Sequence, residues 1–516
     1  MKNSIRVLLA FVIMTSILIS LAACKGNVDE STTSSQVQSS DVETEIPTIH
    51  LKYLTHGIPN LVDEPKYGEE VLAAVNEKLA QDLGFMITTE YISYADDVYQ
   101  EKVSLDLAGG QEYDMIRLPV AAAADLFNKG MLMDLTDVIN SSAPNFKANV
   151  PDNLWAECSA GGKIYALPST GFNVIFGAWI RGEWLDKTGL GMPTTLSQFE
   201  AVMKKFRDED YNETGRNDII PYAVQYDNAE SVLLGLFTET PGDYVDGSGN
   251  IMPKYFDPGY KQFVGLLRNW YGEIYVDDQL FMGDDNSISD LYSQNRVAIA
   301  GLNVWHLEWG PINAVDKNRP EVQTKFMKQF DSEMKGYQSG GMVSSMLGAS
   351  SNSENYEYAV KFVDWYYFNE DNYYLAQKGI QGKTYDIVDN ALTIPEGETA
   401  TTQLELIGLI APQTSVPMEF KYYPATTPVE SKNAYDYAVK EVELSKVYVP
   451  VTKFVTPVIP DDLKIKHDEA LQLLKEDISN IVKGKLSLDD FDKALQDFKD
   501  NGGLEYYEFL TEEYKK

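Results

Sequence analysis

The chain has 516 residues, an apolar share of 44%, and 78 acidic against 43 basic side chains, which gives a formal net charge of −35. A chain this long exceeds one ordinary hydrophobic core, so two or three domains are expected. The negative charge argues against nucleic acid and anionic membrane surfaces as partners, because both would repel the protein.

The first 24 residues predict export. Lys2 and Arg6 precede an apolar run over residues 7–19, and small residues follow, which is the pattern of a secretory signal peptide. The run is shorter than the ~20 residues of a spanning helix. It ends in Leu-Ala-Ala-Cys, which resembles the bacterial lipobox, whose cysteine is lipidated and becomes the mature N-terminus. We therefore expect a signal peptide over residues 1–23 and a lipid on Cys24. An ordinary cleaved signal is the alternative.

Lipidation of Cys24 would hold the protein at the extracytoplasmic face of the bacterial cell membrane, with membrane contact through the anchor only. It leaves Cys158 without a partner for an intrachain disulfide, so we expect Cys158 to be a buried apolar residue. Residues 24–46 are polar and rich in Ser and Thr, which predicts a flexible tether.

Strands and helices alternate after the tether. Residues 48–54 predict a strand, residues 69–83 a helix with apolar side chains at helical spacing, and residues 85–91 a second strand. A short apolar strand at residues 113–116 precedes an Ala-rich helix from Ala121. Such alternation is typical of parallel βαβ units.

Three later segments predict helices. In the helix over residues 195–206, Thr195 and Gln198 form a capping box. Residues 356–369 form an aromatic-rich helix. The third helix begins at Ser487 and ends at two glycines, a common C-terminal signal.

Enzyme motifs are missing from the sequence. It contains no Walker loop, no GxGxxG, HExxH or CxxC, and no GxSxG. Its four histidines are not spaced as a metal pair. Adjacent acids at residues 277–278 and 284–285 could serve as glycosidase carboxylates, but 78 acids give such neighbours by chance. We expect a protein that is not an enzyme, with a surface glycan hydrolase as the alternative.

Residues 161–206 carry the most specific pattern, GGKIYALPSTGFNVIFGAWIRGEWLDKTGLGMPTTLSQFEAVMKKF. This segment resembles the extracellular solute-binding lipoproteins of carbohydrate ABC transporters. Shorter resemblances follow the order of that family at residues 130–139, 294–305, 359–365 and 379–385. The resemblance spans nearly the whole mature chain, in the right order.

The resemblance implies an α/β fold of two lobes, each a central β-sheet flanked by helices, with the ligand in the cleft between them. Lobe 1 would take residues 47–168 and about 343–395, and lobe 2 about 169–342 and 396–516. The protein would be a monomer that captures a carbohydrate, with its size favouring an oligosaccharide, and delivers it to ABC permease subunits. The second interpretation is another ligand, such as a peptide or an acidic glycan. An acidic glycan would need basic residues in the cleft, and the chain offers few.

Residues 210–221, DYNETGRNDIIP, resemble an EF-hand loop. Oxygen donors at alternate positions suit calcium, and Gly215 at the sixth position permits the turn. The candidate ligands are Asp210, Asn212, Thr214, the Arg216 carbonyl and Asp218. Two features depart from the family pattern, because Ile219 replaces an acid and Pro221 stands at the twelfth position. A structural calcium ion and a metal-free turn both remain open, and no other cofactor is expected.

Sugar binding requires aromatic platforms for ring faces and polar groups for hydroxyls. Trp305 follows the strand predicted at residues 297–300, where the resemblance places a cleft aromatic, and is the first candidate. Two further candidates end predicted strands of the first lobe, a usual position for ligand contacts. The remaining candidates, in the order of our preference, are Tyr385, Asn173, Arg181, Arg117 and His56.

Overall fold

The computed structural model describes residues 46–58, 61–150, 152–170, 177–303, 312, 315, 318–339, 343–398, 402–412, 421–454, 457 and 459–515. The predicted signal peptide, the lipidated Cys24 and the tether up to residue 45 lie outside the described residues. Residues 46–516 form a compact unit of their own. Among the described helices, none is long and apolar enough to cross a membrane.

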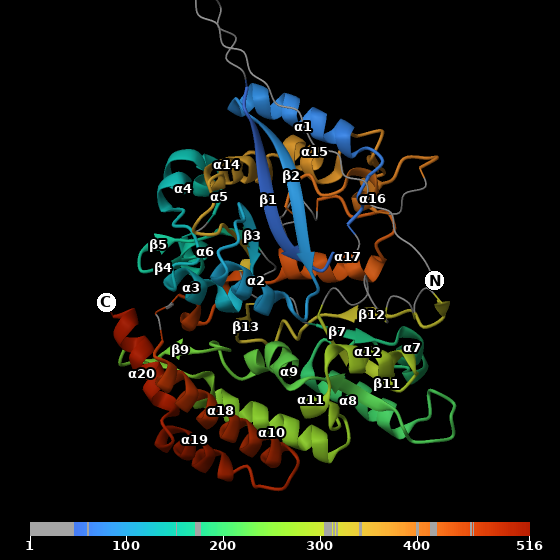
Figure 1. Cartoon of the computed structure of the whole chain (residues 1–516). Coiled ribbons are helices and arrows are strands. Elements are labelled where there is room, and N and C mark those ends of the chain that lie inside the picture. Colours follow the sequence, from blue (N-terminus) through green and yellow to red (C-terminus); the bar gives the residue numbers. More distant parts are fainter. Residues whose placement is uncertain are drawn as a thin grey trace, which may run out of the picture. The chain divides into compact units, whose positions relative to one another are not determined.

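The first sheet has five strands in the order β2-β1-β3-β14-β6. Their bounds are Thr48–His56 (β1), Met86–Tyr94 (β2), Met115–Leu118 (β3), Leu167–Thr170 (β6) and Val343–Gly348 (β14). β1 pairs in parallel with β2 and β3, whereas β14 is antiparallel to β3 and β6. Helix α1 (Gly68–Leu83) joins β1 to β2, and α2 (Tyr99–Ala108) joins β2 to β3, which confirms the predicted βαβ units (Figure 1).

Apolar side chains of this sheet form a first core with α1 and α2. Three later helices also contribute, α14 (Tyr356–Tyr367), α15 (Glu370–Lys378) and α16 (Gln403–Ile407). Cys158 is fully buried there, as expected. Leu406 and Ile407 also belong to this core, and the amide of Tyr67 donates to the Leu406 carbonyl at 2.5 Å. Residues 402–411, which the sequence analysis assigned to lobe 2, therefore pack with the first sheet.

The second sheet has four strands in the order β12-β7-β11-β8. Their bounds are Ala178–Ile180 (β7), Ile220–Val224 (β8), Val297–Gly301 (β11) and Lys325–Met327 (β12). β8 and β11 are parallel, and β7 is antiparallel to β11 and β12. Every residue of β8 and β11 is buried, as in a sheet covered on both faces.

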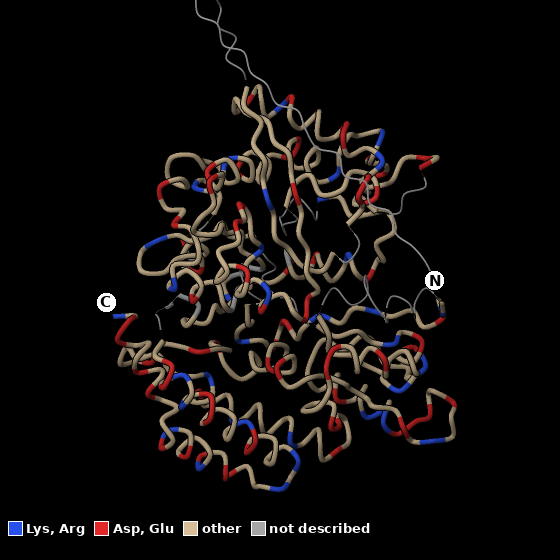
Figure 2. Tube along the Cα trace, viewed as in Figure 1, with Lys and Arg blue, Asp and Glu red and all other residues tan. Residues whose placement is uncertain are grey.

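A second core surrounds this sheet. Its helices include α8 (Leu196–Asp208), α10 (Pro258–Gly272), α18 (Asp461–Val482), α19 (Asp490–Asp500) and α20 (Gly503–Tyr514). Acidic and basic positions are interspersed along the C-terminal helices (Figure 2). One such pair joins two helices, because Lys466 Nζ lies 2.8 Å from Glu505 Oε2.

The described residues contain further helices and short strands. The helices are α3 (Val120–Asn128), α4 (Thr136–Ser142), α5 (Pro144–Asn149), α6 (Asp152–Glu157), α7 (Gly182–Thr188), α9 (Tyr226–Leu233), α11 (Gln279–Met282), α12 (Asp285–Ser293) and α17 (Val429–Asp436). The short strands are β4 (Ser159–Ala160), β5 (Lys163–Ile164), β9 (Tyr244–Val245), β10 (Ile251–Met252), β13 (Tyr337–Gln338), β15 (Asp386–Val388), β16 (Ala391–Thr393) and β17 (Val447–Tyr448).

Candidate functional site

The carboxyl ends of β1, β2 and β3 form one edge of the first sheet. The chain leaves β1 for β2 on one side and then crosses to β3 on the other, so the strand order reverses next to β1. Open α/β sheets bind ligands outside the carboxyl ends of their strands at such a switch point. His56 is the last residue of β1, and Arg117 lies one residue before the end of β3. The structure thus brings two sequence-predicted ligand residues to the same edge.

His56 belongs to a small polar cluster at this edge. Its Nδ1 lies 2.5 Å from Asp96 Oδ1, and its ring centroid lies 4.6 Å from that of Tyr99. The Tyr99 hydroxyl donates to the Arg117 carbonyl at 2.6 Å. The His56 side chain is 31% exposed, so part of the imidazole remains accessible. Sequence reasoning missed Asp96 and Tyr99, although the position of Asp96 just after a parallel strand could have indicated it.

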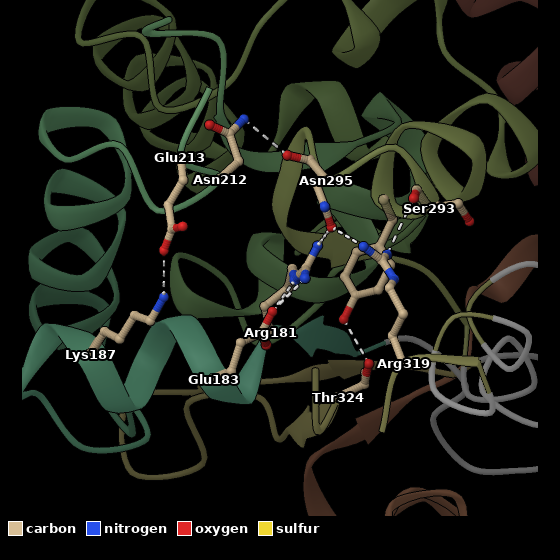
Figure 3. A network of polar contacts seen from close by, with 10 residues as sticks. Arg181, Glu183, Lys187, Asn212, Glu213, Ser293, Asn295, Arg319 and Thr324 are labelled. Atoms are coloured by element: carbon tan, nitrogen blue, oxygen red, sulfur yellow. Dashed lines mark hydrogen bonds and ion pairs between the residues drawn. The ribbon is translucent and has the colours of Figure 1, made fainter. Parts of the chain in front are cut away.

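Arg181 lies away from the carboxyl edge of the second sheet. Because β7 is antiparallel to β11, the residue after β7 falls beside the start of β11, where the Arg181 amide donates to the Ala298 carbonyl. The side chain is only 3% exposed, and its Nη1 donates to Asn295 Oδ1 at 2.5 Å (Figure 3). The guanidinium also lies over the Trp184 ring at 4.1 Å. The expectation that Arg181 contacts ligand therefore loses its geometric basis.

The partner of Arg181 inside the second core is Glu183. Arg181 Nε donates to Glu183 Oε1 at 2.8 Å. Burial raises the pKa of Glu183, and the adjacent guanidinium opposes that shift. Arg181 is therefore paired with a residue of its own chain just after β7, and this pairing does not require a ligand.

Tyr385 is also an interior residue. It is 6% exposed, and its ring stacks on Tyr374 at a centroid distance of 5.7 Å. Burial raises the pKa of its hydroxyl. Packing in the first core is enough to explain an aromatic side chain at this position, so no contact with a ligand is needed. Trp305 and Asn173 lie outside the described residues, as does Cys24.

The predicted calcium loop turns its oxygen atoms toward one another. Thr214 Oγ1 lies 3.0 Å from Asn212 Oδ1, 3.3 Å from Asp218 Oδ1 and 3.4 Å from the Arg216 carbonyl oxygen. The Gly215 amide, at φ 68°, donates to Asp210 Oδ2 at 2.7 Å. Four alternate residues thus surround Thr214 with the oxygen donors that a hard cation prefers.

Other features limit the strength of such a site. Pro221 lies in β8 and offers no carboxylate at the twelfth position. Asp218 Oδ1 already accepts a hydrogen bond from Asn212 Nδ2 at 2.9 Å, which a bound cation would have to displace. Among the described residues, no group of three acidic, His or Cys side chains is placed to hold a metal ion. The donor set therefore fits a weak calcium site with few charged ligands.

The Asn212 side chain is one link between the loop and the second core. Asn212 Nδ2 donates to the Asn295 carbonyl at 3.1 Å, and Asn295 Oδ1 accepts a hydrogen bond from Arg181 Nη1 (Figure 3). Lys187 Nζ and Glu213 Oε1 lie 3.5 Å apart on the exposed side of the loop. The arrangement is suited to a structural role and contains no evident catalytic group.

Comparisons with known proteins agree with this fold. The chain is 28% identical over 258 residues to the fructooligosaccharide ABC transporter substrate-binding protein FusA of Streptococcus pneumoniae, and the match covers 46% of each chain. It is 21% identical to the polygalacturonan/rhamnogalacturonan-binding protein YtcQ of Bacillus subtilis, over 82% of this chain and 84% of YtcQ. The match to FusA thus spans less than half of that relative.

Solved structures extend the likeness to nearly the full length. An HMO-binding, ABC-transporter-associated solute-binding protein from Bifidobacterium longum infantis superposes with a TM-score of 0.63 at 18% identity, covering 90% of this chain and 98% of that one. FusA in complex with kestose gives 0.59 at 20% identity, covering 90% and 99%. Another FusA structure is of an EF-hand mutant. These likenesses confirm the predicted two-lobed α/β fold.

A family profile gives the assignment. The profile of the family described as bacterial extracellular solute-binding protein matches residues 62–373, which is more than half of the chain. The matched residues include β2 and β3, the two strands that pair with β1, and all four strands of the second sheet. The chain therefore belongs to the family of bacterial extracellular solute-binding proteins.

Proposed function

We propose that the chain is a lipid-anchored extracytoplasmic protein that captures an oligosaccharide and delivers it to ABC permease subunits. Family membership over residues 62–373 carries the proposal. FusA is named for a fructooligosaccharide and YtcQ for polygalacturonan and rhamnogalacturonan, and both names support a carbohydrate as the ligand class. A lipid on Cys24 and a monomeric state are parts of the proposal that rest on the sequence.

The proposed ligand site lies at the carboxyl edges of the two sheets, in the cleft between two lobes built on the two cores. His56 and Arg117 contribute from the first sheet, and Trp305 and Asn173 are expected to contribute from segments that follow β11 and β6. The proposed site leaves out Arg181 and Tyr385, because both side chains are buried in the cores.

Binding without hydrolysis is favoured by what the candidate catalytic acids do. Asp278 Oδ1 lies 3.0 Å from Lys483 Nζ, and Asp284 Oδ1 accepts the Ser287 amide at 2.6 Å as the N-cap of α12. Asp285 Oδ1 accepts from Gln225 at 2.8 Å. Each of these carboxylates therefore has a structural partner, which supports a binding protein over a glycan hydrolase.

A structural calcium ion in the loop 210–218 is a further part of the proposal. Asp210, Asn212, Thr214 and Asp218 would hold it through side-chain oxygens, together with the Arg216 carbonyl. The ion would stiffen the turn before β8 by replacing hydrogen bonds between these oxygens and their neighbours. The convergence of the oxygens around Thr214 supports this assignment.

The test is a thermal-shift screen of the purified chain against defined oligosaccharides, with a reducing-end assay on every ligand that binds. A ligand at 100 times its Kd should raise the free energy of unfolding by about 2.7 kcal/mol. No new reducing ends should form. Trp305→Ala should weaken binding about tenfold or more at an unchanged ligand-free Tm, because each 1.4 kcal/mol is about a factor of ten. Release of reducing ends would favour the hydrolase instead.

A further inference from the structure

One crossing of the chain from the first lobe to the second follows residue 425. Just before it, the ring of Tyr422 packs against the first core, with its centroid 5.8 Å from that of Tyr374. The main chain is also held there by Leu392 of β16. The Leu392 amide donates to the Tyr423 carbonyl at 2.9 Å, and the Leu392 carbonyl accepts the Ala425 amide at 2.8 Å. The backbone of residues 423–425 therefore belongs to the first lobe.

The side chain of Tyr423 belongs to the second lobe. Its ring stacks on that of Tyr435 at a centroid distance of 5.8 Å and an angle of 18°, and it packs against the second core. Its hydroxyl donates to Asp436 Oδ1 at 3.0 Å. Both partners lie on α17, which contacts β12 of the second sheet, where Glu430 Oε2 accepts the Phe326 amide at 3.0 Å (Figure 1). Tyr423 thus has its main chain in one lobe and its ring in the other.

The linker beside this contact is a short turn. Pro424, Ala425 and Thr426 are exposed, the Thr427 amide donates to the Pro424 carbonyl at 2.9 Å, and α17 begins two residues later. Two domains joined by an exposed linker move relative to each other unless packed contacts hold them. The lobes also meet where α6 contacts the turn Val451–Phe454. The Tyr423 ring is therefore the packed contact at the α17 end of their boundary.

We propose that Tyr423 is a positioning residue for ligand capture, which holds the two lobes in a defined orientation and so sets the geometry of the cleft between them. A ligand that contacts both lobes needs both halves of its site in place at once. When fewer molecules have the competent orientation, the apparent affinity falls in proportion. The effect on orientation is independent of the ligand, whereas the effect on affinity rests on the proposed function.

The experiment measures the distance between the lobes without ligand. Spin labels are placed at Lys102→Cys on α2 and Ala201→Cys on α8, two exposed positions, in the mature chain with Cys24→Ser. Cys158 is buried and should not react. Pulsed electron paramagnetic resonance gives the distribution of label-to-label distances. Tyr423→Ala should broaden that distribution about twofold, because the lobes lose a packed contact. Tyr423→Phe keeps the ring and should give an intermediate width.

Tyr422→Ala is the matched control. It removes the same ring one residue earlier, from a position that packs in the first core. Both alanine variants should lower the Tm, since each loses buried aromatic contacts. Only Tyr423→Ala should broaden the distance distribution, so this readout separates positioning from stability.

Affinity provides the second readout, with maltotriose, cellotriose and 1-kestose as probes in calorimetric titration. Each probe that the wild type binds should bind Tyr423→Ala about fivefold more weakly, which corresponds to about 1 kcal/mol. Tyr422→Ala should bind it as the wild type does, because the lobes keep their orientation.

The outcomes are distinct. An unchanged distribution in Tyr423→Ala, or equal broadening in Tyr422→Ala and Tyr423→Ala, would overturn the inference. A broadened distribution with unchanged affinity would also overturn it, because the orientation would then not serve capture. Failure of the wild type to bind any of the three sugars would count against the carbohydrate class alone, since the widths are measured without ligand and still decide whether Tyr423 orients the lobes.

Discussion

Arg181 Nη1 donates to Asn295 Oδ1 at 2.5 Å, and the same oxygen accepts from Arg319 Nη1 at 2.6 Å. Asn295 adopts φ 61°, in the left-handed region that few residues other than glycine and asparagine visit. Its main-chain carbonyl accepts from Asn212 of the candidate calcium loop. One residue thus connects the loop to the buried guanidinium group of Arg181 and to the half-buried side chain of Arg319.

Asn295→Ala should destabilise the second core without changing ligand affinity. It removes the shared acceptor and places alanine at a positive φ, so the free energy of unfolding should fall by about 2 kcal/mol. Asn295→Asp is the matched control, because it keeps a side-chain oxygen and tolerates the left-handed conformation. Urea denaturation gives the comparison, and equal losses in the two variants would contradict a role for the shared oxygen.

Calcium should stabilise the chain weakly. Chelation with EDTA should lower the Tm by a few degrees and leave oligosaccharide binding intact, since a ligand that binds only the folded state adds to stability. Asp218→Ala should abolish the response to calcium. Glu213→Gln changes an exposed side chain of the same loop that is not among the predicted ligands, and it should respond as wild type does. Absence of bound calcium after dialysis would show that the loop is a metal-free turn.

Asp364 provides a pH test. Its Oδ1 accepts the Phe146 amide at 2.8 Å, its Oδ2 accepts from Asn145 Nδ2 at 3.1 Å, and burial raises its pKa. The folded state therefore holds this proton to a higher pH than the unfolded chain does. Over that window the unfolded chain binds fewer protons, so the contribution of Asp364 to stability declines as pH rises.

The Asp364→Asn side chain cannot titrate. It also replaces one of the two oxygens that accept from Asn145 and Phe146 with a donor group. Its stability deficit relative to wild type should be about 1–3 kcal/mol. That deficit should be largest at about pH 4, near the ordinary pKa of the carboxyl, and smaller at about pH 7. Urea denaturation at the two pH values measures it. A deficit that grows with pH would show that the carboxylate gains from its partners more than it loses by burial.

Cys24→Ser should give an unlipidated, mislocalised precursor whose folded body is normal, because the variant removes only the thiol that the lipobox presents. Radiolabelled palmitate should enter the wild type and a Cys158→Ala control, but not Cys24→Ser. Cys158 is buried in the first core, so the control isolates the exported cysteine. Incorporation of label into Cys24→Ser would refute the lipoprotein assignment.

The fold could be predicted from local patterns because its elements carry strong signals. The helix α8 begins after Thr195, whose hydroxyl accepts the Gln198 amide at 3.3 Å as expected. The return bond of the predicted capping box differs, because Gln198 Oε1 accepts the amide of Thr194 instead. The predicted elements are present with ends shifted by about three residues or fewer, as usual for frayed termini.

The candidate site was harder to predict because side-chain direction depends on strand direction. Arg117 and His56 lie at the ends of strands that are parallel to each other. Arg181 follows β7, which is antiparallel to β11, so it falls at the opposite edge of its sheet. Tyr385 lies in a family-like segment, yet its ring fills the first core.

The most direct test of the account is calorimetric titration of the purified mature chain with defined oligosaccharides, followed by analysis of the recovered sugar. The account predicts saturable binding of one oligosaccharide per chain, with the recovered sugar intact. A chain that binds no oligosaccharide, that binds a peptide in its place, or that returns shortened sugars would contradict it.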